Sequence, residues 1–336
     1  KSIGNGSFSL SIYPGSQPTY LELVRNGAVA DLMAAGALVK PAFCGPCFGA
    51  GDTPANNELS IRHATRNFPN REGSKPTEGQ VSLVALMDAR SIAATAVNEG
   101  ILTAADEIDV NYSGKRYYFD KTVYEKRVYN GWSKEDPSAE LVYGPNIKDW
   151  PSMPSLTEHV LIKVVTYIND PVTTTDEIIP SGETSSYRSN PMKLAEFTFS
   201  RKDPAYVGKA KEVLKYELSR EEGNNPEEVE ELKEVYNSIR KIEGFEDTNA
   251  QDIGIGSTIY ANKPGDGSAR EYAASCQRIL GAWANIAKEY ATKRYRSNLI
   301  NWGIIPFLIE DKSLIKKDDF IFIPNIKTAI LNKTKD

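Results

Sequence analysis

The first 44 residues alternate between strand and helix patterns, and this order constrains the fold more than any other feature. FSLSIYP at 8–14 alternates apolar and polar residues, as a half-buried strand does. Residues 18–37 place Leu, Val and Met at helical spacing, and LVKPAFC at 38–44 is apolar again. This order predicts a βαβ unit on a mainly parallel sheet. Ligands of such sheets bind beyond the carboxyl ends of the strands, where FCGPCFG would lie.

The rest of the chain also mixes strand and helix patterns. We expect a long helix over 81–100, a hairpin around 111–126, strands over 159–168, 252–261 and 283–291, and a helix after the glycine turn at 265–267. Residues 203–248 hold two charged helical patterns broken at EGNNPEE, whose charges should lie on a solvated face. Three prolines between 144 and 156 indicate a linker. The predicted domains are therefore 1–143 and 157–336, with a linker at 144–156.

Composition narrows the class of protein. A length of 336 residues suits about two domains. With 25% charged residues and a net charge of -5, the chain gives no reason to expect nucleic acid as a partner. No apolar run reaches the roughly 18 residues that span a membrane, and the first residues lack the features of a signal peptide. Three cysteines fit a reducing compartment, so we expect a cytoplasmic protein without membrane contact.

Cys44 and Cys47 form a C-G-P-C turn that suits either a disulfide or a metal ion. A thioredoxin-like site expects a Trp before the first cysteine and a helix directly after the second. Here Phe43 precedes Cys44, and the glycine-rich residues 48–51 follow Cys47. A zinc site needs two further ligands, and the remaining candidates are scattered singly: His63, His159 and Cys276. The four letters alone therefore leave the choice open.

Two further segments carry groups that suit anions. Arg62, Arg66 and Arg71 surround an Asn-Phe-Pro-Asn turn, where guanidinium groups can bind carboxylates through paired hydrogen bonds, although surface solubility explains them equally well. GDGSAREYAA at 265–274 leads from small residues into a helix, with Ser268 and Arg270 at its start. The free N–H groups of such a helix end favour an anion.

Taken together, these segments resemble the aconitase family of iron-sulfur hydro-lyases. That family has motifs of the types C-G-P-C, N-R-N-F-x-G-R and G-S-S-R-E, and CGPC (44–47), TRNFPNR (65–71) and GSARE (267–271) stand here in the same order. Shorter matches are YPGS (13–16), GPNI (144–147), TTTDEIIPSG (173–182), SYRSN (186–190) and NLINWGIIP (298–306). The resemblance covers the C-terminal half of a full enzyme of this kind. It implies an α/β class: the end of a mainly parallel α/β/α domain, then a swivelling β/β/α domain.

The resemblance also implies roles for particular residues. Cys44 and Cys47 would bind a [4Fe-4S] cluster, and the family's third ligand cysteine should lie shortly before Lys1. Ser268 would be the catalytic base for dehydrating a small hydroxy-carboxylic acid. The residues expected to bind the substrate carboxylates are Arg66, Arg71, Arg188 and Arg270. The upstream half of the same enzyme is the expected partner, and without it we expect this chain to be inactive.

Several positions depart from the family pattern. Ala269 stands where the family has a second serine, and Glu177 and Tyr272 stand where it has histidines. Thr65 and Asn70 depart within the arginine motif. Because these positions lie around the substrate, we expect a di- or tricarboxylic hydroxy acid that need not be citrate or isocitrate. The alternatives are a catalytically retired binding or regulatory protein and a Cys-x-x-Cys redox protein.

Overall fold

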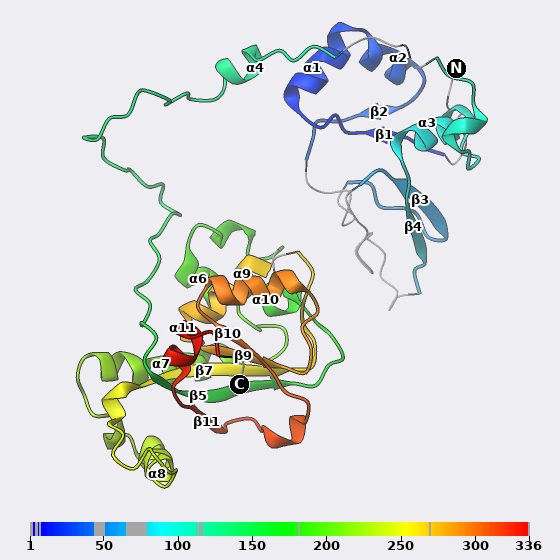
Figure 1. Cartoon of the computed structure of the whole chain (residues 1–336). Coiled ribbons are helices and arrows are strands. Elements are labelled where there is room, and N and C mark those ends of the chain that lie inside the picture. Colours follow the sequence, from blue (N-terminus) through cyan, green and yellow to red (C-terminus); the bar gives the residue numbers. More distant parts are fainter. Residues whose placement is uncertain are drawn as a thin grey trace. The chain divides into compact units, whose positions relative to one another are not determined.

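The structure, a computed structural model, divides into two compact units, Lys1–Ala139 and Glu140–Asp336 (Figure 1). We call them unit 1 and unit 2. The linker predicted at 144–156 falls within the start of unit 2. The described residues, of which Arg270 is described without its side chain, are 3, 6, 8–43, 51–64, 79–111, 113, 117–180, 182–268 and 270–334.

Unit 1 begins with a strand–helix–strand motif. Its elements are β1 (Ser11–Ile12), α1 (Gln17–Arg25), α2 (Ala28–Ala34) and β2 (Leu38–Val39). β1 and β2 pair in parallel, which confirms the predicted βαβ order. α1 begins after Ser16, whose hydroxyl accepts the Thr19 N–H at 3.2 Å. Pro18 suits this first turn because it lacks an N–H that would stay unpaired there.

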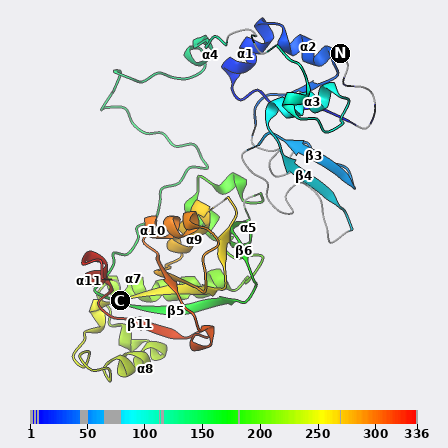
Figure 2. The same ribbon diagram turned by 45° about the vertical axis from the view of Figure 1, so that its right-hand side comes forward.

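A second parallel pair of strands follows in unit 1 (Figure 2). The remaining elements of this unit are β3 (Glu58–Arg62), β4 (Ser82–Leu86), α3 (Ala89–Val97), the 3₁₀ turn η3 (Ala105–Glu107) and α4 (Thr122–Glu125). The long helix predicted over 81–100 is therefore wrong, because its first part is strand β4. Asp88 sets the boundary, since its carboxylate accepts the N–H groups of Arg90 and Ser91 and caps α3. The second arm of the hairpin predicted around 111–126 is also wrong, because residues 117–120 form no strand and Thr122–Glu125 form α4. Residues 112 and 114–116 of that prediction lie outside the described residues.

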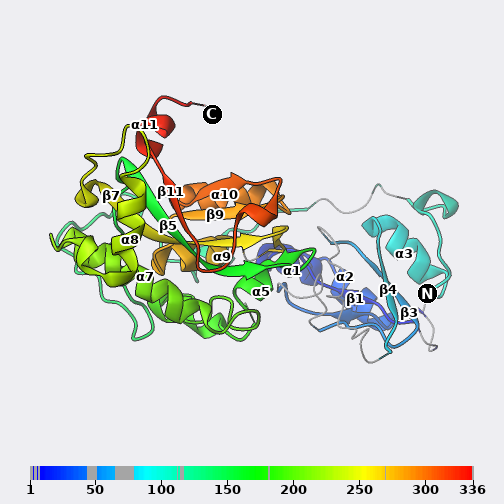
Figure 3. The same cartoon turned by 90° about the horizontal axis from the view of Figure 1, so that it is seen from below.

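Unit 2 is built on a five-stranded sheet in the order β10-β9-β7-β5-β11. Its strands are β5 (His159–Ile168), β7 (Ile253–Ala261), β9 (Ala284–Ala287), β10 (Ile305–Leu308) and β11 (Phe320–Ile323). Four strands run parallel, and β11 runs antiparallel along the outer side of β5 (Figure 3). The strands predicted over 159–168 and 252–261 are confirmed, and the strand predicted over 283–291 is present but shorter, at Ala284–Ala287. This mixed, mostly parallel sheet with helices also confirms the α/β class.

Helices pack against this sheet (Figure 1). They are α5 (Thr175–Ile178), α6 (Pro191–Ala195), α7 (Tyr206–Glu221), α8 (Glu230–Ile239), α9 (Arg270–Ile279), α10 (Lys293–Asn301) and α11 (Ile326–Leu331). Short 3₁₀ turns are η4 (Ser185–Tyr187), η5 (Pro226–Glu228), η6 (Ala250–Asp252) and η7 (Lys312–Leu314). The helices predicted within 203–248 and after 265–267 are confirmed as α7, α8 and α9.

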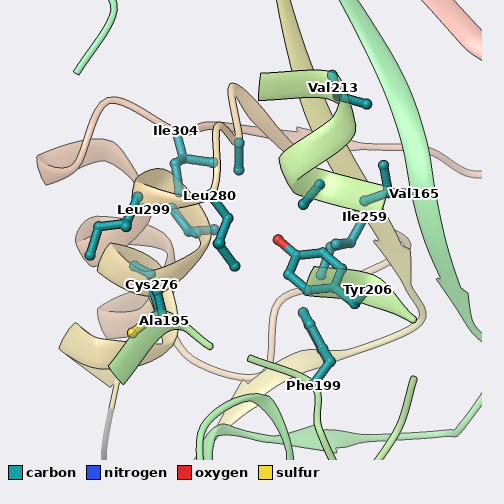
Figure 4. Close-up of a cluster of buried hydrophobic side chains, with 14 of the residues drawn as sticks. Val165, Ala195, Phe199, Tyr206, Val213, Ile259, Cys276, Leu280, Leu299 and Ile304 are labelled. Carbon is teal, nitrogen blue, oxygen red and sulfur yellow. The ribbon is translucent and has the colours of Figure 1, made fainter. Parts of the chain in front are cut away.

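The side chains of β5 alternate between two cores. Leu161 and Val165 join the larger core, which α6, α7, α8, α9 and α10 complete. Figure 4 shows Tyr206 in the middle of that core, between Leu280 and Ile259. The intervening residues of β5 join a smaller core around Trp283 on the other face. Both faces of this strand are thus buried, and each large aliphatic side chain there contributes about 1.5–3 kcal/mol.

One part of the charged segment 203–248 is buried and not solvated as expected. Glu217 on α7 is fully buried, and Arg220 is only 9% exposed. The Arg220 guanidinium donates to both oxygens of the Glu217 carboxylate, at 2.8 and 2.9 Å. Glu217 also accepts the backbone N–H of Ile255 in β7 at 2.7 Å. This pair therefore joins α7 to the central strand of the sheet, whereas the sequence pattern predicted only surface charge.

Candidate active site

The structure describes some of the predicted site residues and not others. Four lie outside the described residues: Cys44, Cys47, Arg66 and Arg71. The backbone of Arg270 begins α9, and its side chain is not described. Ser268 and Arg188 are described in full, and both lie in unit 2. The roles predicted for all of these residues stay predictions.

The chain on both sides of the cysteine segment is held by Tyr13. The ring of Tyr13 packs against Phe43, directly before Cys44, with 5.3 Å between the ring centroids. Its hydroxyl donates to the carboxylate of Asp52, on the other side of residues 44–50. One side chain just after β1 thus contacts Phe43 on one side of the predicted ligand segment and Asp52 on the other.

Asp52 is the centre of a polar cluster that we call the flanking network, formed by Ser11, Tyr13, Lys40 and Asp52. Ser11 Oγ and Lys40 Nζ each donate to Asp52 Oδ1 at 2.9 Å, and Lys40 also reaches the Tyr13 hydroxyl at 3.2 Å. Partial burial disfavours the Asp52 carboxylate, but the hydrogen bonds from Tyr13, Lys40 and Ser11 outweigh it and lower its pKa. Burial and the Asp52 carboxylate raise the pKa of Tyr13, which keeps its hydroxyl a donor.

Arg62 connects this network to the next strand. Its side chain is buried, and Nη2 donates to the Asp52 carbonyl at 3.3 Å while Nε donates to Ser60 Oγ at 2.9 Å. Sequence reasoning noticed Arg62 only as a cation near the arginine motif and missed the network. The available signals were the YPGS match at 13–16 and the aspartate that follows the cysteine turn.

Ser268 lies on a turn that only glycine can form. The turn follows β8 (Pro264–Asp266), which pairs with β6 (Thr173–Thr174), and α9 begins at Arg270. Gly267 has φ +121°, and a Cβ there would lie 2.4 Å from Oγ1 of Thr175, a buried residue of α5. The glycine turn therefore fixes the backbone beside Ser268, an exposed residue two positions before the start of α9.

Arg188 lies near the same helix end. It follows η4, and its guanidinium carbon is 6.0 Å from the ring centroid of Tyr272, the third residue of α9. The next residue, Ser189, accepts the N–H of Lys148 at 2.9 Å through its backbone carbonyl. The structure thus brings Arg188 and the start of α9 together, although they are about 80 residues apart in the sequence.

A depression of about 400 Å³ borders Ser268. Its lining residues are Ser268, Glu271, Lys293, Arg294, Ser297 and Asn298. The Glu271 carboxylate accepts a hydrogen bond from Trp302 Nε1 and another from Asn298 Nδ2, both at 2.5 Å. Trp302 in turn stacks on Trp150, with 4.6 Å between the ring centroids. Sequence reasoning identified Ser268 here but missed the residues that α10 contributes.

The departures from the family pattern at Glu177 and Tyr272 have defined contacts. Glu177 forms a capping box with Thr174, whose N–H donates to the Glu177 carboxylate at 2.7 Å. The same carboxylate pairs with Lys202 at 2.9 Å. Tyr272 packs beneath Arg188. A glutamate at 177 therefore stabilises the start of α5, next to the glycine turn.

The predicted cluster ligands agree chemically with an iron-sulfur site, since cysteine thiolates are the usual ligands of cluster iron. The described residues contain no group of three or more His, Cys, Asp or Glu side chains placed to hold a metal ion. Cys276 lies in the core of unit 2, where burial raises the pKa of its thiol to about 12. His159 Nδ1 accepts the Asn325 N–H at 2.9 Å.

No helix in the described part of the chain has both the length and the apolar character that crossing a membrane requires.

Comparisons with known proteins identify similar families and relatives. A model of the aconitase family (aconitate hydratase) matches residues 4–94, and a model of the aconitase C-terminal domain matches residues 218–312. Mitochondrial aconitate hydratase of Candida albicans is 23% identical over 333 residues, which cover 92% of this chain and 39% of that protein. The 3-isopropylmalate dehydratase large subunit of a Thermoanaerobacter species is 36% identical over 101 residues, 30% of this chain and 23% of that subunit.

A solved structure of 3-isopropylmalate dehydratase from Methanocaldococcus jannaschii is also similar. It is 23% identical, covers 53% of this chain and 78% of its own, and has a TM-score of 0.31. The matched part of this chain thus spans well under half of the two curated relatives, 39% of one and 23% of the other.

Proposed function

This chain belongs to the aconitase family, and from that premise we propose that it forms part of a hydro-lyase acting on a di- or tricarboxylic hydroxy acid. The two family matches lie in different units, at 4–94 and 218–312, so the likeness includes both regions with predicted site residues. The relatives are named aconitate hydratase and 3-isopropylmalate dehydratase, and both names describe addition or removal of water.

The observation that carries this proposal is the glycine turn that presents Ser268. Removing a proton next to a carboxylate requires a base held at a fixed place, and Gly267 fixes this turn against Thr175. A serine acts as a base only where N–H groups or positive charge stabilise its alkoxide. Ser268 lies two residues before the start of α9, and the free N–H groups and dipole of such a helix end favour negative charge nearby. We assign proton transfer to Ser268 Oγ.

The arginines would bind the substrate carboxylates. Arg188 lies over Tyr272, the third residue of α9. A guanidinium binds a carboxylate through two parallel hydrogen bonds and so orients the substrate as well as holding it. Arg270, Arg66 and Arg71 complete the proposed set. Glu177 and Tyr272, in place of histidines, support a substrate other than citrate or isocitrate.

Cys44 and Cys47 would hold a [4Fe-4S] cluster as thiolates. When bound, a cluster with an open iron position supplies a Lewis acid for the departing hydroxyl. The flanking network supports this role, because Tyr13 contacts the chain on both sides of residues 44–50. The third cysteine ligand would come from a longer chain or a separate subunit that pairs with this one. The cytoplasmic location expected from the sequence stays a prediction, since one relative is mitochondrial.

The test is reconstitution with iron and sulfide under anaerobic conditions, with the upstream part of the natural protein present. We expect a cluster absorbance and turnover of a hydroxy acid from a panel of di- and tricarboxylates. The Ser268→Ala variant should keep the cluster absorbance and lose turnover by about 10²-fold or more. The matched control is Ser238→Ala, because Ser238 is an exposed serine on α8 that only bonds the Glu234 carbonyl. Full turnover by Ser268→Ala would refute the role of Ser268.

A second candidate, a retired member that only binds, is favoured by one observation. Glu177, at a position where the family has a histidine, is held in a capping box and an ion pair. This candidate predicts cluster formation without turnover of any acid in the panel. Turnover of any acid in the panel by the wild type would contradict retirement, whereas turnover that arises only in Glu177→His would support it.

A further inference from the structure

Two cations beside Ser268 have no role in the site described so far. Lys293 and Arg294 line the same depression as Ser268, and both are exposed at the start of α10. Within the described residues, neither side chain forms an ion pair or a hydrogen bond. Their positive charge is therefore available to a ligand in the depression.

Their place on α10 is unfavourable to the helix itself. The N-terminal end of a helix carries a positive partial charge, so acidic residues stabilise it and cations destabilise it. The first turn of α10 contains no acidic residue, and Lys293 and Arg294 are its first two residues. Local conflicts of this kind are expected at functional sites. Stability of α10 does not explain why two cations stand there.

The nearby carboxylate does not neutralise them. Glu271 is the acidic residue of the lining, and both of its oxygens are occupied. Oε1 accepts the Trp302 indole N–H, and Oε2 accepts the Asn298 amide. The lining of the depression thus has two positive side chains and one carboxylate, which is already hydrogen-bonded. This excess of positive charge suits an anionic ligand.

The cations are fixed relative to Ser268. Thr292, which caps α10, donates from Oγ1 to the Gly265 carbonyl at 3.4 Å, and the Ala291 N–H donates to the Pro264 carbonyl at 3.0 Å. The Tyr295 ring packs so closely on Gly265 that a Cβ there would lie 2.2 Å away. The start of α10 is therefore packed against the strand that leads to Ser268.

We propose that Lys293 and Arg294 bind a carboxylate of the substrate and so help to determine which acid the enzyme accepts. This inference rests on the proposed hydro-lyase function. Lys293, Arg294 and Ser268 border one depression, so a carboxylate bound by these cations would hold an acid in the depression that Ser268 also lines. A substrate with a carboxylate at this place is favoured over one with an alkyl group there.

The test is a titration of the ¹⁵N-labelled chain with propane-1,2,3-tricarboxylate, followed by amide chemical shifts. We expect shifts to concentrate at Ser268, Lys293 and Asn298. The double variant Lys293→Gln/Arg294→Gln should weaken binding about tenfold, and each single variant should give part of that loss. The matched control is Arg296→Gln, because Arg296 is exposed on the same helix outside the lining. It should leave the affinity unchanged.

Two outcomes would overturn the inference. An unchanged affinity in the double variant, or an equal loss in Arg296→Gln, would show that these two cations form no specific site. Inorganic phosphate at the same ionic strength is the second probe, and equally strong binding of phosphate would overturn the assignment to a carboxylate. The titration needs neither cluster nor turnover. If the Ser268→Ala test fails, the result of the titration is still valid. If the titration fails, the hydro-lyase proposal is not affected.

Discussion

The two units hold their predicted site residues in different ways. In unit 2, Ser268 lies on a turn between strand β8 and helix α9, and α9 packs through Ala273 and Cys276 into a core whose members are fully buried. In unit 1, the cysteine segment is flanked by a polar network on short, two-stranded sheets. Apolar side chains of β4 in unit 1 are exposed to solvent, Leu83 by 61% and Leu86 by 49%.

This difference shows which interactions hold the predicted site residues of each unit in place. A core that buries both faces of a strand holds a turn by packing, and such packing is close to that of an organic crystal. Isolated two-stranded sheets are marginal in water, so unit 1 depends more on individual hydrogen bonds. The chain also spans only part of its relatives, with 39% of the aconitate hydratase covered. We expect unit 1 to open at lower free energy than unit 2.

The largest expected effect tests the core of unit 2. Glu217→Ala leaves Arg220 buried without its partner and the Ile255 N–H without an acceptor. Removing one member of a buried ion pair costs about 3–5 kcal/mol. Urea unfolding with hydrogen exchange of β7 should show this loss in unit 2 and none in unit 1. Glu212→Ala, an exposed glutamate on the same helix, is the control and should change stability by less than about 0.5 kcal/mol.

The next effect concerns the glycine turn. Gly267→Ala forces a Cβ against Thr175 at a φ that suits only glycine, and we expect a loss of about 1–3 kcal/mol in the unfolding free energy of unit 2. Gly208→Ala is the matched control: Gly208 lies within α7 with open space around it, and alanine there should raise stability by about 0.5–1 kcal/mol. Equal stability of Gly267→Ala and the wild type would contradict the argument that packing fixes this turn.

The sequence predicted the regular parts of both units. Long alternating or apolar segments such as 159–168 were identified correctly because strand patterning depends on near neighbours. The helix predicted over 81–100 failed because Val and Leu at 82–86 suit a strand as well as a buried helix, and pairing with β3 decided between them. Asp88 was the local signal for the true start of α3.

The candidate site was predictable only in part. The glycine turn and Ser268 were visible because they are contiguous in the sequence. Tyr13, Lys40 and Asp52 meet only after folding, so spacing could not connect them. The same holds for Glu217, which looked like one of many surface charges until α7 packed it against β7. Contacts between residues that are far apart in the sequence cannot be predicted from patterns of neighbouring residues.

The flanking network of unit 1 should respond to acid. Its hydrogen bonds hold the pKa of Asp52 below that of an unfolded aspartate, about 3.9. A lowered pKa stabilises the folded state above that value, and the contribution is lost as the pH falls below it. Asp52→Asn should cost unit 1 about 1–2 kcal/mol at neutral pH and weaken its acid dependence.

The measurement is exchange of the Lys40 N–H, which donates to the Ile12 carbonyl at 2.9 Å, between pH 3 and 7. Asp106→Asn, an exposed aspartate in the same unit, should leave this exchange unchanged. If Asp52→Asn exchanges like the wild type across this range, the network does not hold the strands that flank the cysteine segment.

The smallest expected effect decides where the chain can bend between the units. Trp150 stacks on Trp302, and the Lys148 N–H donates to Ser189, so the second half of the predicted linker is attached to unit 2. Trp150→Ala should cost about 0.5–1.5 kcal/mol and speed exchange of the Lys148 N–H. Trp132→Ala is the control, because Trp132 is 84% exposed in unit 1. Faster exchange in Trp150→Ala, but not in Trp132→Ala, would show that the Trp150–Trp302 contact holds the linker residues from Lys148 onward to unit 2. The bend between the units would then lie before Lys148. Unchanged exchange in Trp150→Ala would mean that the chain can bend anywhere in the predicted linker, residues 144–156.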